Sequence, residues 1–116
     1  MNGFALEIKN NIENEIVTIE KVLYCDELDM GIKGYIQQME SLTRMLNIPT
    51  SLNSGIKLNL MGRIGAPEKE RPFNITIELK NKDSCRIGVE TQVTVEVFQA
   101  HDWPHWKISF NNTPIH

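Results

Sequence analysis

Residues 86–97 read Arg-Ile-Gly-Val-Glu-Thr-Gln-Val-Thr-Val-Glu-Val, and this alternation is the clearest structural signal in the sequence. Side chains that alternate in polarity at every second residue belong on opposite faces of a β-strand. One face of the predicted strand carries Ile87, Val89, Thr91, Val93, Val95 and Val97, and the other carries Arg86, Glu90, Gln92, Thr94 and Glu96. Gly88 is typical of a bulge or bend. The segment therefore predicts a long strand with one buried face.

Three further segments share the period of two: 56–61, 74–80 and 106–110. Residues 65–72, 81–84 and 100–104 are rich in turn formers and predict short connections. Consecutive strands joined in this way form an antiparallel meander, which can pack one face on helices and leave the other in water. The side chains expected on the buried face are Ile75, Ile77, Val89, Val93, Val95, Val97, Trp106 and Ile108. The opposite face is of mixed charge and predicts a solvated surface.

The first segment of the chain shows a different period. Apolar residues recur there at steps of four, four, three and four, at Ile8, Ile12, Ile16, Ile19 and Leu23. This spacing predicts a helix over about residues 5–24. The alternative is a short strand through Phe4, Leu6 and Ile8, a turn at Asn10-Asn11, and a second strand over 16–24, which is rich in β-branched residues.

A second helix is predicted from about Asp29 to Pro49, with its start weakened by Gly31 and Gly34. Its apolar positions are Ile32, Tyr35, Ile36, Met39, Leu42, Met45 and Leu46. The expected fold is therefore α+β, with two N-terminal helices packed on one face of a four-stranded antiparallel meander sheet. We expect a single domain over 1–116, with a helical part at 1–49 and the sheet at 54–112.

Composition narrows the class of protein. A chain of 116 residues with 41% hydrophobic and 23% charged side chains is typical of one globular domain. No apolar run is long enough to cross a membrane, and the first residues do not resemble a secretory signal. The two cysteines, Cys25 and Cys85, lie far apart in the sequence, which favours reduced, packed thiols. We therefore expect a cytoplasmic protein.

Charge is distributed unevenly along the chain. Residues 1–54 hold eight acidic side chains against four basic ones, whereas the net charge of the whole chain is −3. An acidic surface repels the phosphates of nucleic acids and attracts basic protein surfaces. We therefore expect a basic protein as the partner and no nucleic acid.

The segment His101-Asp102-Trp103-Pro104-His105 is the densest cluster of chemically useful side chains. Histidine and aspartate are zinc ligands, and histidine is a general base near neutral pH. In an extended chain, however, the two histidines would lie roughly 13 Å apart, too far to share one ion. A solvated hairpin tip, or an interface in which tryptophan is the anchor, explains the segment better.

No motif for a cofactor or for catalysis stands out. A phosphate-binding glycine loop is absent, and the acidic neighbours of Cys25 disfavour a reactive thiolate. We therefore expect a protein without enzymatic activity or cofactor.

The expected function is that of a small binding module, such as an inhibitor or immunity-type protein of bacterial or phage origin that neutralises a basic toxin or nuclease. Its predicted partner-binding residues are Trp103, Asp102, His101, His105, Glu13, Glu15 and Glu20. One alternative is a metal-binding domain or metal-dependent enzyme centred on His101, Asp102 and His105. The other is a homo-oligomer formed through an edge strand, either the one from Ile56 or the one ending at Phe110.

Overall fold

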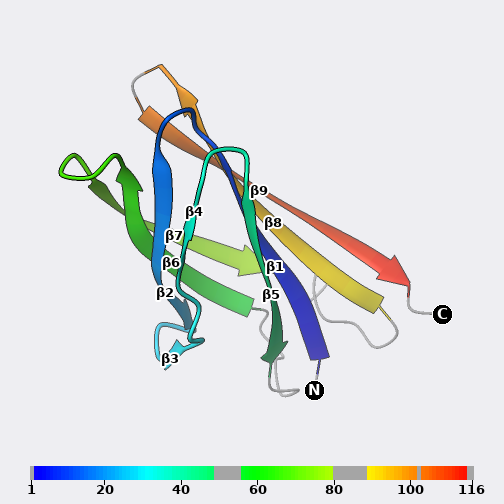
Figure 1. Ribbon diagram of the computed structural model, residues 1–116. Coiled ribbons are helices and arrows are strands. Elements are labelled where there is room, and N and C mark those ends of the chain that lie inside the picture. The colour runs from blue at the N-terminus through cyan, green and yellow to red at the C-terminus, as the bar shows by residue number, and fades with distance from the viewer. Residues whose placement is uncertain (1, 49–55, 80–88, 102, 115–116) are drawn as a thin grey trace.

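The computed structural model describes residues 2–48, 56–79, 89–101 and 103–114, and every regular element within these ranges is a β-strand (Figure 1). The strands are β1 (Asn2–Asn11), β2 (Ile16–Tyr24), β3 (Leu28–Asp29), β4 (Gly34–Ile36), β5 (Ser41–Ile48), β6 (Ile56–Gly65), β7 (Arg71–Leu79), β8 (Val89–Ala100) and β9 (Trp103–Pro114). The prediction of an α+β fold with two helices is therefore wrong. No helix capable of spanning a membrane occurs among the described residues.

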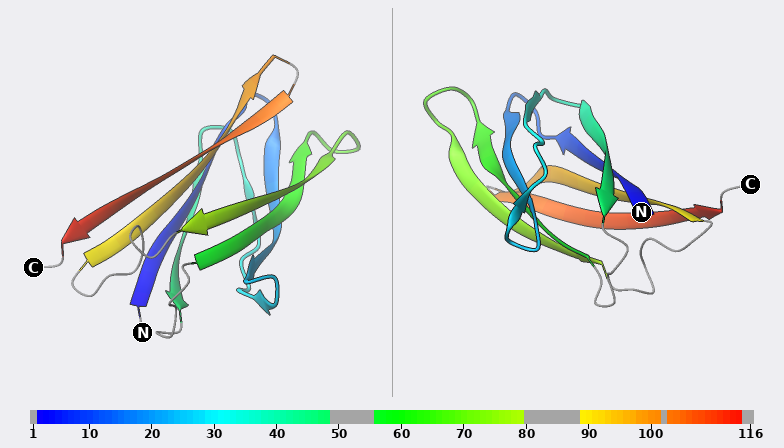
Figure 2. Two further views of the ribbon diagram at one scale, coloured as in Figure 1. Left: turned by 180° about the vertical axis from the view of Figure 1, so that it is seen from behind. Right: turned by 90° about the horizontal axis from the view of Figure 1, so that it is seen from below.

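The strands form two sheets that lie face to face as a sandwich (Figures 1 and 2). The first sheet has the order β5-β1-β8-β9, and within it β1 runs parallel to β8 and antiparallel to β5. The second sheet has the order β3-β2-β6-β7, and β4 also pairs with β2. The chain therefore passes from one sheet to the other four times: between β1 and β2, β4 and β5, β5 and β6, and β7 and β8.

The predicted strand at 86–97 is confirmed over its described part, which belongs to β8. Thr91, Val93, Val95 and Val97 are fully buried between the sheets. The three valines meet inward-facing residues of both sheets in one hydrophobic core, which includes Leu6, Ile8, Val17, Ile19, Val22, Leu58, Leu60, Ile64 and Ile77. Ile87 and Gly88 lie outside the described residues.

The predicted helix over 5–24 is replaced by β1, a crossover and β2. The alternative strand interpretation is confirmed, although the turn occupies residues 12–15 rather than Asn10-Asn11. In β2 the pairing with β6 shifts between Ile19 and Lys21, so that Glu20 is the extra residue of a bulge. The buried positions consequently change phase, from Val17 and Ile19 to Val22 and Tyr24. The crossover and the bulge interrupt the period of two and leave a spacing that resembles a helix.

The predicted helix over 29–49 is also wrong, because this region forms β3, β4 and β5. Its expected apolar stripe is split: Ile32, Ile36 and Leu46 are buried, whereas Tyr35, Met39 and Met45 are exposed. Gly31 and Met39 adopt positive φ angles of 72° and 63°, which a right-handed helix does not allow.

The single four-stranded meander is corrected as well. The hairpins β6–β7 and β8–β9 form as predicted, but they belong to different sheets. On the expected buried face, Ile77 is buried, and Ile75 and Trp106 pack against the core. Ile108, by contrast, keeps 40% of its surface exposed. The inner face of β8 is covered by the second sheet, where helices were expected.

Candidate functional site

The last pair of the β8–β9 hairpin joins Ala100 to Trp103, and the turn begins at His101. His101 has a φ of 59°, the left-handed conformation that tight hairpin turns require. Its carbonyl oxygen accepts a hydrogen bond of 3.3 Å from the side-chain amide of Gln99. Asp102 lies outside the described residues. The predicted hairpin tip is therefore present around His101.

The histidine of β9 lies on a different part of the hairpin. His105 pairs with Phe98 of β8, and their rings stack with centroids 5.9 Å apart. The next residue, Trp106, points to the opposite face and contacts the ring of Phe73 at 4.7 Å. Within the described ranges, no group of three metal-ligating side chains comes together. The metal-binding alternative therefore stays a prediction from the sequence.

The three glutamates predicted to face a partner lie in two different places. Glu13 is exposed in the crossover between β1 and β2. Glu15, at the end of the same crossover, forms an ion pair of 3.1 Å with Arg71. Glu20 lies in β2 and forms an ion pair of 3.1 Å with Arg63. Both arginines come from more than 40 residues away in the sequence, and local pattern gives no signal for such pairs.

The crossover lies beside the hairpin at one end of the sandwich, which is at the top in Figure 1. We call this region the loop end and define it as residues 12–15, 37–40 and 99–101. The amide of Asn14 donates a hydrogen bond of 3.2 Å to the side chain of Gln38, which joins the first two segments. A hollow of about 490 Å³ joins the first and the third, and it is lined by Asn11, Ile12, Glu13, Glu15 and Gln99.

The loop end is acidic on the side of this hollow. Glu13 and Glu15 both line it. Glu96 in β8 accepts a hydrogen bond from the side chain of Asn11 but lies opposite Lys9 of β1 and Lys107 of β9, so it adds little to this acidic charge. Arg71 compensates one of these charges, through its ion pair with Glu15. The arrangement can attract a cationic group and offers the amide of Gln99 as an additional hydrogen-bonding group.

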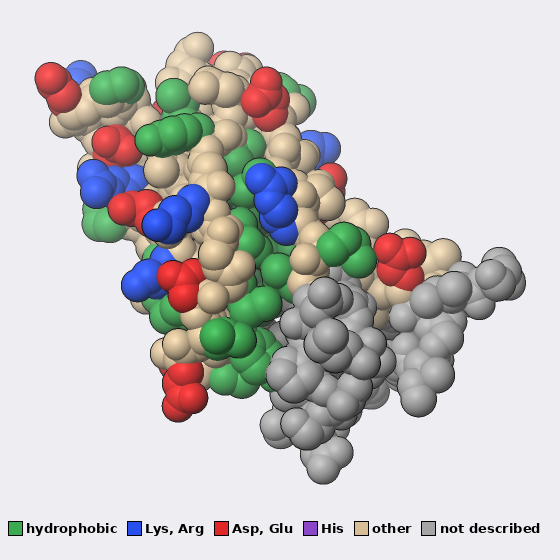
Figure 3. Space-filling view, turned by 60° about the horizontal axis from the view of Figure 1, so that its bottom comes forward, with side chains coloured by type: hydrophobic (Ala, Val, Ile, Leu, Met, Phe, Trp, Pro, Cys, Tyr) green, Lys and Arg blue, Asp and Glu red, His purple; other side chains and the backbone are tan. Residues whose placement is uncertain are grey.

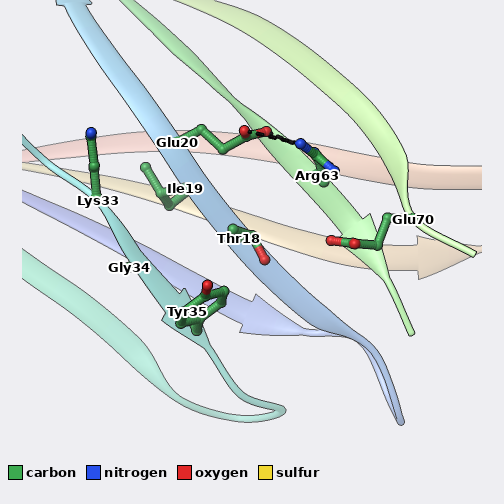
Figure 4. A pocket seen from close by; sticks show the side chains of 8 residues that line it. All are labelled: Thr18, Ile19, Glu20, Lys33, Gly34, Tyr35, Arg63 and Glu70. Carbon is green, nitrogen blue, oxygen red and sulfur yellow. Dashed lines mark hydrogen bonds and ion pairs between the residues drawn. The ribbon is translucent and has the colours of Figure 1, made fainter. Parts of the chain in front are cut away.

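A second hollow, of about 500 Å³, lies on the outer face of the second sheet (Figure 4). It is lined by Thr18, Ile19, Glu20, Lys33, Gly34, Tyr35, Arg63 and Glu70. The bulge in β2 brings Glu20 toward Arg63, and the hydrogen bond between them raises the pKa of the arginine. Two acids and two bases balance here. On the face of the molecule drawn in Figure 3, acidic and basic side chains lie next to one another. This hollow therefore does not select a partner by the sign of its charge.

Comparison with protein-family models, with curated proteins and with solved structures found no match to this chain.

Cys25 lies at the other end of the sandwich, in the turn between β2 and β3. Positive φ angles at Cys25 and Asp26, of 52° and 63°, are those of a type I′ turn. The thiol is free and exposed, so the prediction of a packed cysteine is wrong for Cys25. Asp26 forms an ion pair of 2.9 Å with Lys57, and this hydrogen bond lowers the pKa of the carboxyl group.

Proposed function

We propose that this protein is a binding module that holds a basic protein partner at its loop end. The observation that carries the proposal is the hollow that unites Glu13 and Glu15 of the crossover with Gln99 of the β8–β9 hairpin. Two of the predicted residues, Glu13 and Glu15, line this hollow; its hairpin member, Gln99, was not predicted and precedes the predicted His101 by two positions. An inhibitor or immunity-type protein that neutralises a basic toxin or nuclease would use such a surface.

Glu13 is the central residue of the proposed surface. Its side chain is exposed and forms no ion pair with another residue that the structure describes, so it can meet a lysine or arginine of the partner directly. Glu15 already contacts Arg71, and its attraction for a partner is correspondingly weaker. Glu20 lines the other hollow, so we leave it out of the proposed surface. Exposed charges of this kind mainly accelerate association, and salt screens their effect.

The test is affinity purification of the tagged protein from its native host, with the recovered proteins quantified by mass spectrometry. We compare the wild type with Glu13→Lys and with the matched control Glu27→Lys. Glu27 is also an exposed glutamate, but it lies in the β2–β3 turn at the opposite end of the sandwich. A partner bound at the loop end is recovered by the wild type and by the control, and is lost with Glu13→Lys.

Two further measurements make the test specific. The association rate of the purified complex should fall about tenfold in Glu13→Lys and should fall with added salt in the wild type. Equal recovery by all three proteins, or association that does not depend on salt, would contradict the proposal. A wild type that recovers no basic protein would contradict it as well.

A further inference from the structure

β9 is a long open edge of the first sheet. It spans 12 residues and, in the described part of the chain, hydrogen-bonds to β8 alone. Open edges of this length pair readily with another strand unless prolines or charges protect them. Between Pro104 and Pro114, β9 holds one residue that is charged at pH 7, Lys107. The strand from Ile56 is different, because β6 lies between β2 and β7 and has no open edge.

The inner face of β9 also leaves apolar surface uncovered. Ile108 and Phe110 pair with Val95 and Val93, which are fully buried, yet they remain 40% and 45% exposed. A strand added beside β9 would bring apolar side chains next to both. An occupant of this edge therefore gains backbone hydrogen bonds together with apolar contact.

We propose that the occupant is a second copy of this chain, paired antiparallel through β9 with Ser109 on the two-fold axis. Residues that lie opposite each other in a ladder have their side chains on the same face of the sheet. In a pair of identical antiparallel strands, the two-fold axis must therefore pass between the two copies of one residue. Ser109 is the midpoint between Pro104 and Pro114. This register gives the longest ladder that has proline, which lacks an N–H group, only at its two ends.

The side chains favour the same register. It places Ile108 of each copy opposite Phe110 of the other, so that four apolar side chains meet on the inner face. On the outer face it places Lys107 opposite the second copy's Asn111, which avoids a pair of like charges. A ladder centred on Lys107 would instead oppose two ammonium groups.

The direction of the backbone N–H groups also fits a ladder centred on Ser109. Proline is tolerated in an edge strand where its nitrogen faces away from the neighbouring strand. The backbone nitrogens of every second residue in a strand point to the same side. Ile108 and Phe110 are even-numbered, like Pro104 and Pro114, so their N–H groups point away from β8, as the two proline nitrogens do. A ladder centred on Ser109 then forms about eight new hydrogen bonds. The result is one continuous sheet of twice four strands, β5-β1-β8-β9 from each copy.

Sedimentation equilibrium over a wide range of protein concentrations tests the proposal. We expect the wild type to be a dimer, and Ser109→Lys to weaken it about tenfold or more because two ammonium groups meet on the axis. The matched control is Gln92→Lys, which adds the same charge to the outer face of β8, one strand away from the edge. It should leave the dimer intact. Because Ser109 and Gln92 are both exposed, both variants should fold, which circular dichroism verifies.

A charge-swap experiment tests the register itself. Ser109→Asp alone should also dissociate, whereas its mixture with Ser109→Lys should form a mixed dimer detectable by native mass spectrometry. A wild type that stays monomeric at the highest concentration overturns the proposal. So does a dimer that neither Ser109 variant weakens. The proposal uses the edge of β9 and not the loop end, so its failure would leave the proposed function unaffected.

Discussion

Replacing Asn10 tests how the crossover between the sheets is held. Asn10 is the last inward-facing residue of β1, and its side chain is fully buried. Its amide nitrogen donates hydrogen bonds of 2.9 Å to the carbonyl oxygens of Glu15 and Ile36. Its side-chain oxygen accepts a bond of 2.9 Å from the amide of Ile12. One side chain thus joins the start and the end of the crossover to β4 in the other sheet.

The expected loss of stability follows from three backbone groups that lose the Asn10 side chain as their partner in Asn10→Ala: the carbonyl oxygens of Glu15 and Ile36 and the amide of Ile12. Each buried polar group that loses its hydrogen bond costs about 1–3 kcal/mol, and the site can relax only in part. We therefore expect a loss of about 3–5 kcal/mol in the free energy of unfolding, a large share of the 5–15 kcal/mol that is typical of a domain. With a urea m-value of about 1.5 kcal/mol/M, the midpoint falls by roughly 2–3 M.

The assay is urea unfolding followed by the fluorescence of the two tryptophans. Asn74→Ala is the control, because Asn74 is exposed on β7 and should change the free energy of unfolding by less than about 0.5 kcal/mol. An Asn10→Ala variant within 1 kcal/mol of the wild type, roughly the value of one ordinary hydrogen bond, would refute the reasoning.

The variant Asn10→Asp adds a pH dependence with a defined sign. Burial and the carbonyl oxygens of Glu15 and Ile36 would raise the pKa of the introduced carboxyl group above its unfolded value. A raised pKa in the folded state stabilises the protein below the unfolded pKa of about 3.9, and this contribution is lost as the pH rises. The destabilisation relative to the wild type should therefore grow between about pH 4 and pH 7. A difference that does not change with pH would show that the carboxyl group reaches solvent.

Two further perturbations test the second sheet. Gly62→Ala would place a Cβ atom 1.9 Å from the carbonyl oxygen of Thr18, so we expect a loss of about 2–4 kcal/mol by thermal unfolding. Gly34→Ala meets only ordinary contacts at 3.6 Å and should change little; equal effects would contradict the steric argument. For Asp26, the hydrogen bond from Lys57 lowers the pKa, so its contribution to stability is present above the unfolded pKa and lost as the pH falls through the folded one. Lys57→Met should raise the pKa of Asp26, as measured by a carbon-detected NMR titration, and an unchanged pKa would show that the ion pair is not formed in solution.

The sequence predicts β8 well because local alternation and burial agree there. Every second residue from Thr91 to Val97 is buried, and no bulge or crossover interrupts the strand. In β2 the same signal fails at Glu20, where a single extra residue moves the buried set from odd to even positions. Because of this shift, the apolar residues of β2 follow a spacing that resembles a helix. Helical spacing is therefore a weak indicator in a segment that is also rich in β-branched residues.

The candidate site was predicted in parts but not as a whole, and the parallel pairing of β1 with β8 explains why. Because the two strands are adjacent and run in the same direction, with Asn11 paired to Phe98, the segments that follow them leave the sheet at the same end. Glu13 and His101 therefore share the loop end, although 87 positions separate them in the sequence. Residue types and spacing identify each segment, but they contain no signal for a parallel pairing over this distance. The proposed function depends on this pairing, because it places the acidic crossover beside the hairpin.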